Sequence, residues 1–541
     1  MPRPLAKKGS FSQEEISLTT PSSPVSLSRP VDLPVYTDHD PQEKPHSRYD
    51  YQEKGGDHDD EHGESAALLS EMEGMEEKED SHNRVSRRRK LLALGFSFLI
   101  LSVVGGSAWW SKGPPSSGSV GAQNLGVLSN GTHEFKPTVL MVSLDGLRAE
   151  YVERNLTTHL HDISVQGLRA KFIRPVFPSL TFPNHWSLMT GLYAESHGLV
   201  ANTFFDPISE DTFRYTDPTH SWNASWWGGE PAWATAVKAG LKTANLMWPG
   251  PPVTSEGISP TYYVPFENHV ALDWKHDKIF EWLDMPMEVR PQLITAYEPS
   301  VDQVGHKFGP SSPEVDDALK AVDKFSRRIH NSLKERNLTH IVDVIFVSDH
   351  GMVDTSDTRL VYVDDVLGKD GWEAIEHNDG WPSYGLRFKQ GTNTTEMLRR
   401  LYAGAASMNP RAFDVYVTES YYKDETIRYS DNLGDGLHIV HMPERYHYSD
   451  NIRIAPIYAV PRNHGYDPDE PAMHAIFVAD GPFSTSTKVK QASKSATADL
   501  SAPLVMEGFQ NVEIYGLVAK LLGLKGAPTN GTQGFWDAWL D

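Results

Sequence analysis

The sequence predicts an α/β fold in which helices flank a mainly parallel central sheet, preceded by a disordered tail and one transmembrane helix. Short apolar runs typical of buried parallel strands occur at residues 138–144, 292–297 and 343–348. Helix-like stretches such as 313–325 separate them, and this alternation is typical of an α/β domain. The chain has 541 residues, enough for one large domain of this class or two ordinary ones.

The first 90 residues differ in composition from the rest of the chain. Residues 1–90 are rich in Ser, Pro, Asp, Glu and His and show little apolar periodicity. Such a segment cannot bury enough surface to offset the entropy lost on ordering, so we interpret it as a disordered acidic tail. The whole chain carries 50 Lys and Arg against 72 Asp and Glu, which argues against a nucleic-acid surface held by bulk charge. It has no cysteine, which excludes disulfides and thiolate metal sites.

A membrane anchor is predicted at residues 91–110. This stretch carries no charged residue, and a helix of its length matches a hydrocarbon core of roughly 30 Å. The basic cluster 87–90 precedes it, so the N-terminal tail is expected in the cytosol. We therefore expect a single-pass type II membrane protein whose folded part is lumenal or extracellular, in the vacuole, the Golgi or at the cell surface.

Glycosylation sequons support this orientation, because they all follow the predicted anchor. Their asparagines are Asn130, Asn155, Asn223, Asn337, Asn393 and Asn530. Residues 111–136 include a run rich in Gly, Pro and Ser and are interpreted as a flexible stalk. Residues 353–440 show a less regular pattern, and we assign no elements there.

Candidate metal ligands follow the three predicted strands. Asp145 follows the first strand, Asp302 follows the second after a short loop, and Asp349 with His350 follows the third. Ligands gather at the carboxyl ends of strands in open parallel sheets, so these side chains are expected to lie together. Taken alone, an Asp-Gly pair such as the one at Asp145 is usually a turn.

Two further histidines extend this set. Asp302 and His306 are four residues apart, so one helical turn can place both on one face. His464 lies in a turn-like context that alone is more typical of a structural histidine. Two cations need several oxygen and imidazole ligands, and these aspartates and histidines together with Thr181 supply a complete two-metal site for phosphoryl transfer.

Thr181 is the candidate nucleophile. It lies where an apparent loop runs into a helix, and Pro183 suits the first helical turn. The amides and dipole at a helix N-terminus favour an alkoxide and an incoming phosphate, although an ordinary N-cap threonine is also compatible with this pattern. Coordination to zinc lowers the pKa of a hydroxyl, so that the alkoxide can attack phosphorus.

Over about residues 137–525 the chain resembles the nucleotide pyrophosphatase/phosphodiesterase family of the alkaline phosphatase superfamily. The resemblance rests on motifs in the family's order, at 144–146, 181–185, 190–197, 226–231, 248–250, 302–306, 348–352, 442–445 and 464–466. The predicted anchor and the lack of cysteine resemble its fungal membrane-anchored members, whereas the cysteine-rich somatomedin-like and nuclease-like modules of animal members are missing. The resemblance implies an alkaline-phosphatase-like fold, with a catalytic phosphodiesterase domain at 137–525 and a C-terminal segment at 526–541.

The resemblance also implies roles for the matching residues. Two Zn²⁺ ions are expected. One would be held by Asp302, His306 and His464, and the other by Asp145, Asp349 and His350 with the Thr181 oxygen. Asn202 matches the side-chain donor to the phosphoryl oxygen, and Phe182 matches the aromatic that stacks on the base. A second aromatic is expected from Tyr262, Tyr263 or Phe266, among which the sequence does not choose; Tyr263 and Phe266 join Phe182 as candidate substrate-binding residues.

The implied reaction is zinc-dependent hydrolysis of nucleotide pyrophosphate and phosphodiester bonds through a covalent threonine intermediate, releasing nucleoside 5′-monophosphates. The expected substrates are nucleoside triphosphates, dinucleotides and 5′-nucleotidyl esters, with no sequence-specific nucleic acid. The neutral amide of Asn202 suits a diester with one negative charge better than a dianionic monoester. The alternatives are a phosphodiesterase for phospholipid head groups such as glycerophosphocholine, on the same site, and an inactive ectodomain scaffold, which would require a broken ligand set.

Overall fold

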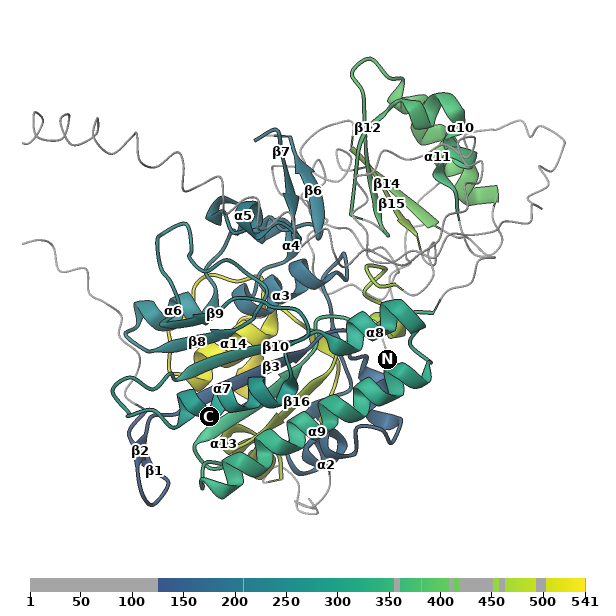
Figure 1. The fold of residues 1–541 in the computed structure, drawn as a ribbon. Helices are drawn as coiled ribbons and strands as arrows, with labels where there is room; N and C mark the ends of the chain where they lie inside the picture. The colour runs from purple at the N-terminus through teal and green to yellow at the C-terminus, as the bar shows by residue number, and fades with distance from the viewer. Residues whose placement is uncertain are drawn as a thin grey trace, which may run out of the picture. The chain divides into compact units, whose positions relative to one another are not determined.

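The computed structural model describes residues 125–540, except for 208, 355–360, 381, 408–412, 418–450, 457–462 and 493–502 (Figure 1). The predicted tail at 1–90, the predicted anchor at 91–110 and the first part of the predicted stalk lie outside the described residues. Among the helices of the described part, none is both long and apolar enough to cross a membrane.

An eight-stranded sheet lies at the centre of the fold, in the order β17-β4-β16-β11-β3-β10-β8-β9. The three predicted strands are neighbours in it, as β3 (Thr138–Leu144), β10 (Leu293–Glu298) and β11 (Val342–Val347). The central strand β3 pairs parallel with both of the others. Every residue of the three strands is buried, which explains why they are continuous apolar runs rather than alternating ones.

The sheet is mixed. β16 (Phe477–Asp480) runs antiparallel to β11 and to β4 (Leu168–Ala170), while the other neighbouring pairs are parallel. The remaining strands of this sheet are β8 (Thr243–Leu246), β9 (Tyr262–Val264) and β17 (Leu504–Met506). The expectation of a mainly parallel sheet flanked by helices therefore holds for most pairs, and β16 is the exception.

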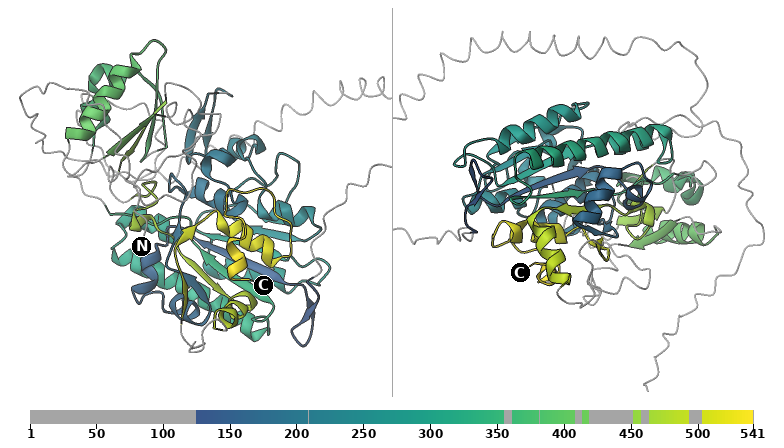
Figure 2. Two further views of the ribbon diagram at one scale, coloured as in Figure 1. Left: turned by 180° about the vertical axis from the view of Figure 1, so that it is seen from behind. Right: turned by 90° about the horizontal axis from the view of Figure 1, so that it is seen from below.

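Helices cover both faces of the sheet (Figure 2). Alternate residues of β3 divide between two cores: Leu140 and Val142 face one, and Val139 and Met141 face the other. The first core is closed by α2 (Thr158–Gln166), α7 (Leu272–Leu283) and α9 (Pro313–Glu335). The second is closed by α3 (Thr181–Thr190), α6 (Ala232–Lys238), α13 (Pro482–Ala492) and α14 (Glu513–Leu521).

Packed structure extends beyond residues 137–525 at both ends. β1 (Leu128–Ser129) and β2 (Glu134–Phe135) form an antiparallel pair within the region interpreted as a stalk. Phe135 is buried, and the carbonyl of Glu134 accepts a hydrogen bond from Arg290 Nη1 at 2.8 Å. At the other end, Trp536 is buried and its Nε1 donates to the carbonyl of Glu513 at 2.7 Å.

A second, smaller sheet is built largely from residues 353–440, to which we assign no elements from the sequence, and partly from residues 451–456, which lie beyond that stretch. Its order is β12-β13-β15-β14, with every neighbouring pair antiparallel. The strands are β12 (Ile375–Asp379), β13 (Tyr384–Phe388), β14 (Phe413–Val417) and β15 (Asn451–Pro456). β12, β13 and β14 pack with α10 (Val363–Glu373) and α11 (Thr394–Ser407) around a separate apolar core. We call the described part of residues 361–456 the insertion lobe.

A buried ion pair lies behind the end of β10. Lys275 Nζ, on α7, donates to Glu298 Oε2 at 2.8 Å and to the carbonyl of Tyr297 at 2.9 Å. The side chains of Lys275 and Glu298 are 2% and 5% exposed. Glu298 Oε1 also accepts from the amide of Ser300, the first residue of α8 (Ser300–Phe308), at 3.0 Å. The pair therefore fixes the turn from β10 into α8.

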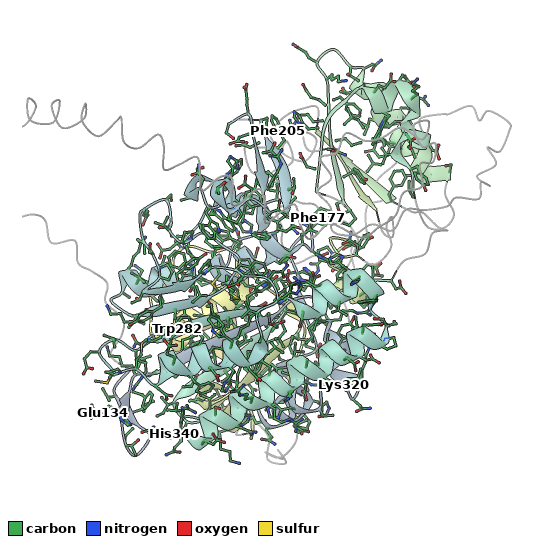
Figure 3. All side chains as sticks on the ribbon, in the orientation of Figure 1. Glu134, Phe177, Phe205, Trp282, Lys320 and His340 are labelled. Atoms are coloured by element: carbon green, nitrogen blue, oxygen red, sulfur yellow. The ribbon has the colours of Figure 1, made fainter. Side chains whose placement is uncertain are left out.

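Replacing Lys275 with Met is expected to lower the free energy of unfolding by about 3–5 kcal/mol, because Glu298 would become a buried charge without its partner. Urea denaturation of the full-length chain measures this change. Lys320→Met is the matched control, since Lys320 (labelled in Figure 3) pairs with Asp317 on an exposed surface and should contribute little. Equal effects of the two substitutions would contradict the structural role of the buried pair.

Candidate metal centre

The candidate ligands meet beyond the carboxyl ends of β3, β10 and β11. Asp145 follows β3 directly, and Asp349 and His350 lie just beyond β11. Asp302 and His306 lie one turn apart on α8, which begins immediately after β10. The structure brings the candidates together in two groups, Asp302 with His306 and His464, and Asp145 with Asp349 and His350. Within each group one ligand atom per residue lies within 4.8 Å of the others.

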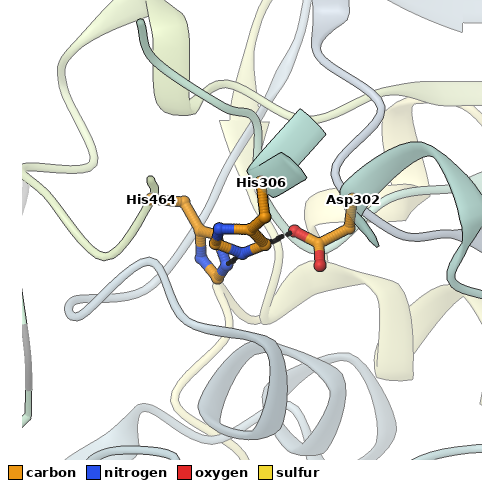
Figure 4. A group of neighbouring side chains, drawn as sticks. All are labelled: Asp302, His306 and His464. Carbon is orange, nitrogen blue, oxygen red and sulfur yellow. Dashed lines mark hydrogen bonds and ion pairs between the residues drawn. The ribbon is translucent and has the colours of Figure 1, made fainter. Parts of the chain in front are cut away.

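Figure 4 shows the side chains of the first group, one of which is oriented by a backbone carbonyl. His464 Nδ1 donates to the carbonyl of Ser179 at 2.8 Å, so its Nε2 carries the lone pair. That Nε2 lies 3.1 Å from His306 Nε2, and each of the two nitrogens lies 3.4 Å from Asp302 Oδ1. Burial lowers the pKa of His464 to about 3, which keeps this imidazole neutral and able to ligate.

The second group shows the same arrangement. His350 Nδ1 donates to the carbonyl of Gly351 at 2.9 Å, which leaves Nε2 as the acceptor atom. His350 Nε2 lies 3.0 Å from Asp349 Oδ2 and 3.4 Å from Asp145 Oδ1. The rings of His350 and His464 stack with their centroids 3.5 Å apart, so the two groups are adjacent.

Both groups fit divalent cations. Asp145 Oδ1, Asp302 Oδ1 and Asp349 Oδ2 are buried and accept no well-directed hydrogen bond from the described residues. A buried carboxylate oxygen without a donor is costly, and here each one faces an imidazole nitrogen that carries a lone pair or shares a proton. A cation satisfies these atoms together, and the nitrogen and oxygen donors are of the kind that zinc accepts.

One of the three carboxylates, that of Asp145, is electrostatically unfavourable without a cation. Burial raises the pKa of Asp145 well above its usual range, and the charges of Asp349 and Asp302 raise it further. Burial also acts to raise the pKa of Asp302, but effects led by the charge of the neighbouring His306 outweigh it and this pKa falls to about 2. The site therefore holds several carboxylates close together, and a bound cation would neutralise their repulsion.

Thr181 is the first residue of α3, as expected from its sequence context. Its side chain is nearly buried, and Oγ1 lies 3.2 Å from His350 Nε2. Asn202 lies beside it, because its Oδ1 accepts a hydrogen bond from the amide of Phe182 at 3.0 Å. The carbonyl end of Asn202 thus faces the helix, and its NH₂ group is the end suited to donate to a ligand.

The candidate aromatic residues fall into different surroundings. Phe182 is half-buried and lies 5.2 Å from the ring of Tyr215. Phe266 is 48% exposed and lies 5.9 Å from Tyr297, whose hydroxyl donates to Asp145. Tyr263 is half-buried against Trp222.

Tyr262 differs from these three. Its hydroxyl donates to the carbonyl of Val289 at 2.9 Å, and its ring stacks on the buried Trp282, labelled in Figure 3. Its ring therefore packs against the core that α7 and α9 close.

Sequence reasoning missed two supporting residues. Tyr297, the penultimate residue of β10, donates its hydroxyl proton to Asp145 Oδ2. His185 Nδ1 donates to the carbonyl of Thr181 at 2.9 Å and lies 3.3 Å from Asp349 Oδ2, while its Nε2 lies 2.8 Å from Ser143 Oγ. The signal for His185 was its position four residues after Thr181, one helical turn away. No local signal indicates the role of Tyr297.

Residues 139–482 match the model of the type I phosphodiesterase/nucleotide pyrophosphatase family. The chain belongs to this family. The family is one of enzymes of the alkaline phosphatase superfamily, and hydrolysis of phosphodiester bonds is the reaction that its name describes.

Relatives from distant organisms share the matching region. An uncharacterized pyrophosphatase/phosphodiesterase of Schizosaccharomyces pombe is 37% identical over 75% of this chain and 81% of its own length. Family member 3 of the ectonucleotide pyrophosphatase/phosphodiesterases of Rattus norvegicus is 32% identical over 74% of this chain and 43% of its own length. A venom phosphodiesterase of Naja atra is 33% identical over 73% of this chain and 45% of its own length. The chain thus spans most of the yeast relative but less than half of the rat and cobra relatives.

Solved structures show the same fold. Murine ectonucleotide pyrophosphatase/phosphodiesterase 5 superposes with a TM-score of 0.60 at 29% identity, over 75% of this chain and 100% of that one. An inactive threonine-to-alanine form of the same murine protein, in complex with AMP, superposes equally well at 28% identity.

Removal of metal with EDTA is expected to lower the melting temperature of the full-length chain by about 5 °C or more, because a cation that binds only the folded state stabilises it. Differential scanning fluorimetry measures the shift, and added zinc should reverse it. The melting temperature of His464→Ala should fall less on addition of EDTA, since this variant lacks one candidate ligand and should bind the cation more weakly. His340→Ala, at an exposed histidine (labelled in Figure 3), should respond like the wild type. A melting temperature that EDTA leaves unchanged would argue against a structural cation here.

Proposed function

We propose that this chain hydrolyses nucleotide pyrophosphate and phosphodiester bonds at a two-zinc site and releases nucleoside 5′-monophosphates. The observation that carries the proposal is the position of Thr181 Oγ1, 3.2 Å from a ligand nitrogen and at the N-terminus of a helix. The names of the relatives support it. So does the murine neighbour, which binds AMP as an inactive form lacking a threonine.

The ligand sets are assigned as the family resemblance implies. Asp302, His306 and His464 would hold one zinc, and Asp145, Asp349 and His350 would hold the other together with Thr181. Bound zinc would lower the pKa of the Thr181 hydroxyl and neutralise charge that builds up on the phosphoryl oxygens.

The chain's own residues then account for two displacement steps. Thr181 Oγ attacks the α-phosphorus as its proton passes to solvent, and the bond from phosphorus to the leaving group breaks, releasing pyrophosphate from ATP. The nucleotide is now an ester of Thr181. Water attacks the same phosphorus, the bond to Thr181 Oγ breaks, and the nucleoside monophosphate leaves with the hydroxyl restored. Throughout, the Asn202 NH₂ group donates to a phosphoryl oxygen, and its bond to the Phe182 amide keeps it oriented.

Aromatic side chains near the nucleophile are proposed to select nucleotides. Phe182 follows Thr181 directly, and Phe266 lies near Tyr297 at the edge of the metal groups. Tyr263 is the third candidate for stacking on the base. Tyr262 is not proposed, because its hydroxyl and ring are engaged by Val289 and Trp282.

We further propose that the catalytic domain faces the secretory lumen or the cell exterior, behind a single N-terminal anchor at 91–110. Five of the six sequon asparagines are exposed in the structure, as glycosylation requires. These are Asn155, Asn223, Asn337, Asn393 and Asn530. Exposure supports the proposal, and peptide N-glycosidase treatment of the chain isolated from its host, followed by electrophoresis, tests it; an unchanged mobility would count against a lumenal location.

Thr181→Ala is expected to reduce hydrolysis of ATP by about three or more orders of magnitude, because it removes the nucleophile. The assay follows products of the full-length chain with zinc, and the wild type should yield AMP and pyrophosphate. Thr190→Ala is the matched control: this threonine lies on the same helix, is buried and donates to the carbonyl of Trp186 at 2.7 Å, yet takes no part in the site. Retained activity of a folded Thr181→Ala variant would refute the mechanism.

Product analysis and a comparison of substrates separate the alternative activities. ADP and phosphate as products of ATP would mean that the site places the γ-phosphorus, and not the α-phosphorus, next to the nucleophile. Faster cleavage of p-nitrophenyl phosphocholine than of the p-nitrophenyl ester of TMP would indicate a head-group phosphodiesterase on the same metal site.

A further inference from the structure

We propose that the insertion lobe is a positioning part of the catalytic site, in which Ser383 holds the loop of His464 and Asp379 holds the hairpin that follows Asn202. This inference rests on the proposed function, because it assigns a purpose to residues that touch the ligands' neighbours. Neither Ser383 nor Asp379 belongs to the two ligand groups. Asp379 ends β12 and Ser383 directly precedes β13, in a lobe that has its own apolar core.

The first contact joins the lobe to the His464 loop. Ser383 is 2% exposed, and its Oγ donates to the carbonyl of Gly465 at 2.8 Å. The approach is close, since a Cβ on Gly465 would lie 2.7 Å from Pro382 Cδ and 2.8 Å from Leu180 Cδ2. Gly465 also has a φ of +96°, a conformation that other residues rarely adopt. The lobe, the His464 loop and the residue before Thr181 therefore meet at one point.

The opposite side of the same loop is held by the segment that leads to the nucleophile. Ser179 Oγ donates to the carbonyl of Tyr466 at 2.7 Å and accepts from the amide of Gly465 at 3.2 Å. The carbonyl of Ser179 accepts from His464 Nδ1. His464 is thus oriented by Ser179, and Ser383 fixes the next peptide group from the lobe side. A ligand's orientation depends on such partners, whose loss usually weakens metal affinity about 10–100-fold.

The second contact joins the lobe to Asn202. The hairpin β6 (Thr203–Asp206) and β7 (Asp211–Arg214) begins directly after Asn202. Asp379 Oδ1, in the lobe, accepts from the amide of Phe205 at 2.9 Å. The ring of Phe205, labelled in Figure 3, stacks on His377 with centroids 3.7 Å apart and planes at 5°. The lobe therefore anchors β6 three residues from the side chain proposed to contact the phosphoryl oxygen.

The two contacts make separable predictions. Ser383 acts next to a metal ligand, so its loss should weaken zinc binding. Asp379 acts next to a phosphoryl donor, so its loss should slow turnover at saturating zinc, because small displacements of a catalytic group reduce the rate strongly. A lobe that is merely attached to the catalytic domain would show neither effect.

The zinc arm uses the full-length chain in mild detergent and competition with a chromophoric chelator. Ser383→Ala is expected to weaken zinc binding about tenfold. Ser484→Ala is the control: Ser484 is 1% exposed and its Oγ also donates to a glycine carbonyl, that of Gly481, at 3.0 Å, away from the site. Zinc affinities of Ser383→Ala and Ser484→Ala that both equal the wild type's would overturn the proposal for the His464 loop.

The turnover arm compares Asp379→Ala with Asp379→Asn on the p-nitrophenyl ester of TMP. Asp379→Ala removes the acceptor and should lower kcat about tenfold with zinc affinity unchanged, whereas Asp379→Asn keeps an acceptor oxygen and should recover most of the rate. Equal rates for Asp379→Ala and the wild type would overturn the Asn202 part. Circular dichroism checks that each variant folds. If Asp379→Ala does not fold, the zinc affinity of Ser383→Ala decides whether the lobe has a positioning role.

The outcomes also separate this inference from the proposed function. A wild type that binds zinc but cleaves no nucleotide would remove the proposed function, while the zinc affinity of Ser383→Ala would still decide the role of the lobe. A wild type that binds no zinc would overturn both.

Discussion

The rest of the structure depends on one electrostatic constraint, the burial of several carboxylates within one small site. Asp145, Asp302 and Asp349 are each less than 10% exposed; burial raises the pKa of Asp145, and the charges of the other two raise it further. Like charges in such a place destabilise a fold unless imidazoles or cations balance them. The parallel strands supply the means of bringing them together, because the ends of β3, β10 and β11 lie side by side in one sheet. The ion pair of Lys275 and Glu298 then fixes where α8 begins, and hence where Asp302 points.

Hydrogen bonds to backbone carbonyls determine which ring nitrogen of His350 and of His464 faces the carboxylates. His350 and His464 each donate Nδ1–H to a carbonyl, of Gly351 and of Ser179, so that both present Nε2 to the carboxylates. A histidine with the opposite tautomer would aim an N–H at the carboxylates and would have no lone pair to offer a cation there. Because both Nε2 atoms are aimed inward by the fold itself, the site is arranged for a cation before one arrives. Thr181 Oγ1 lies beside His350 Nε2, so the proposed nucleophile and a candidate ligand occupy the same location.

The sequence predicts the part of this arrangement that follows from continuous patterns. β3, β10 and β11 are long apolar runs because both sheet faces are covered, and ligands directly after them had to meet at one edge. Features that depend on distant pairing escape such reasoning. β16 has four residues, too few for a pattern of apolar residues to identify it as a strand. Its antiparallel direction depends on its pairing with β11 and β4. The strands of the insertion lobe have five or six residues, and β12 alternates half-buried and exposed residues before the buried Asp379, so they lack the continuous apolar runs of β3, β10 and β11. The bond from His464 to Ser179 spans 285 positions of the chain, so no local signal reports it.

This dependence on distant pairing gives the ligand set a second consequence. Each group draws its members from segments that are far apart in the chain, and a cation that binds them stabilises only conformations in which those segments are already packed. His464 is the extreme case, because its loop is bonded both to Ser179 near the nucleophile and, through Gly465, to Ser383 in the insertion lobe. On the proposed assignment, metal affinity therefore depends on more than the six ligand side chains. It also depends on how stably the insertion lobe, the loop before Thr181 and the ends of the central strands pack together, so substitutions that touch no ligand are expected to change metal affinity through that packing.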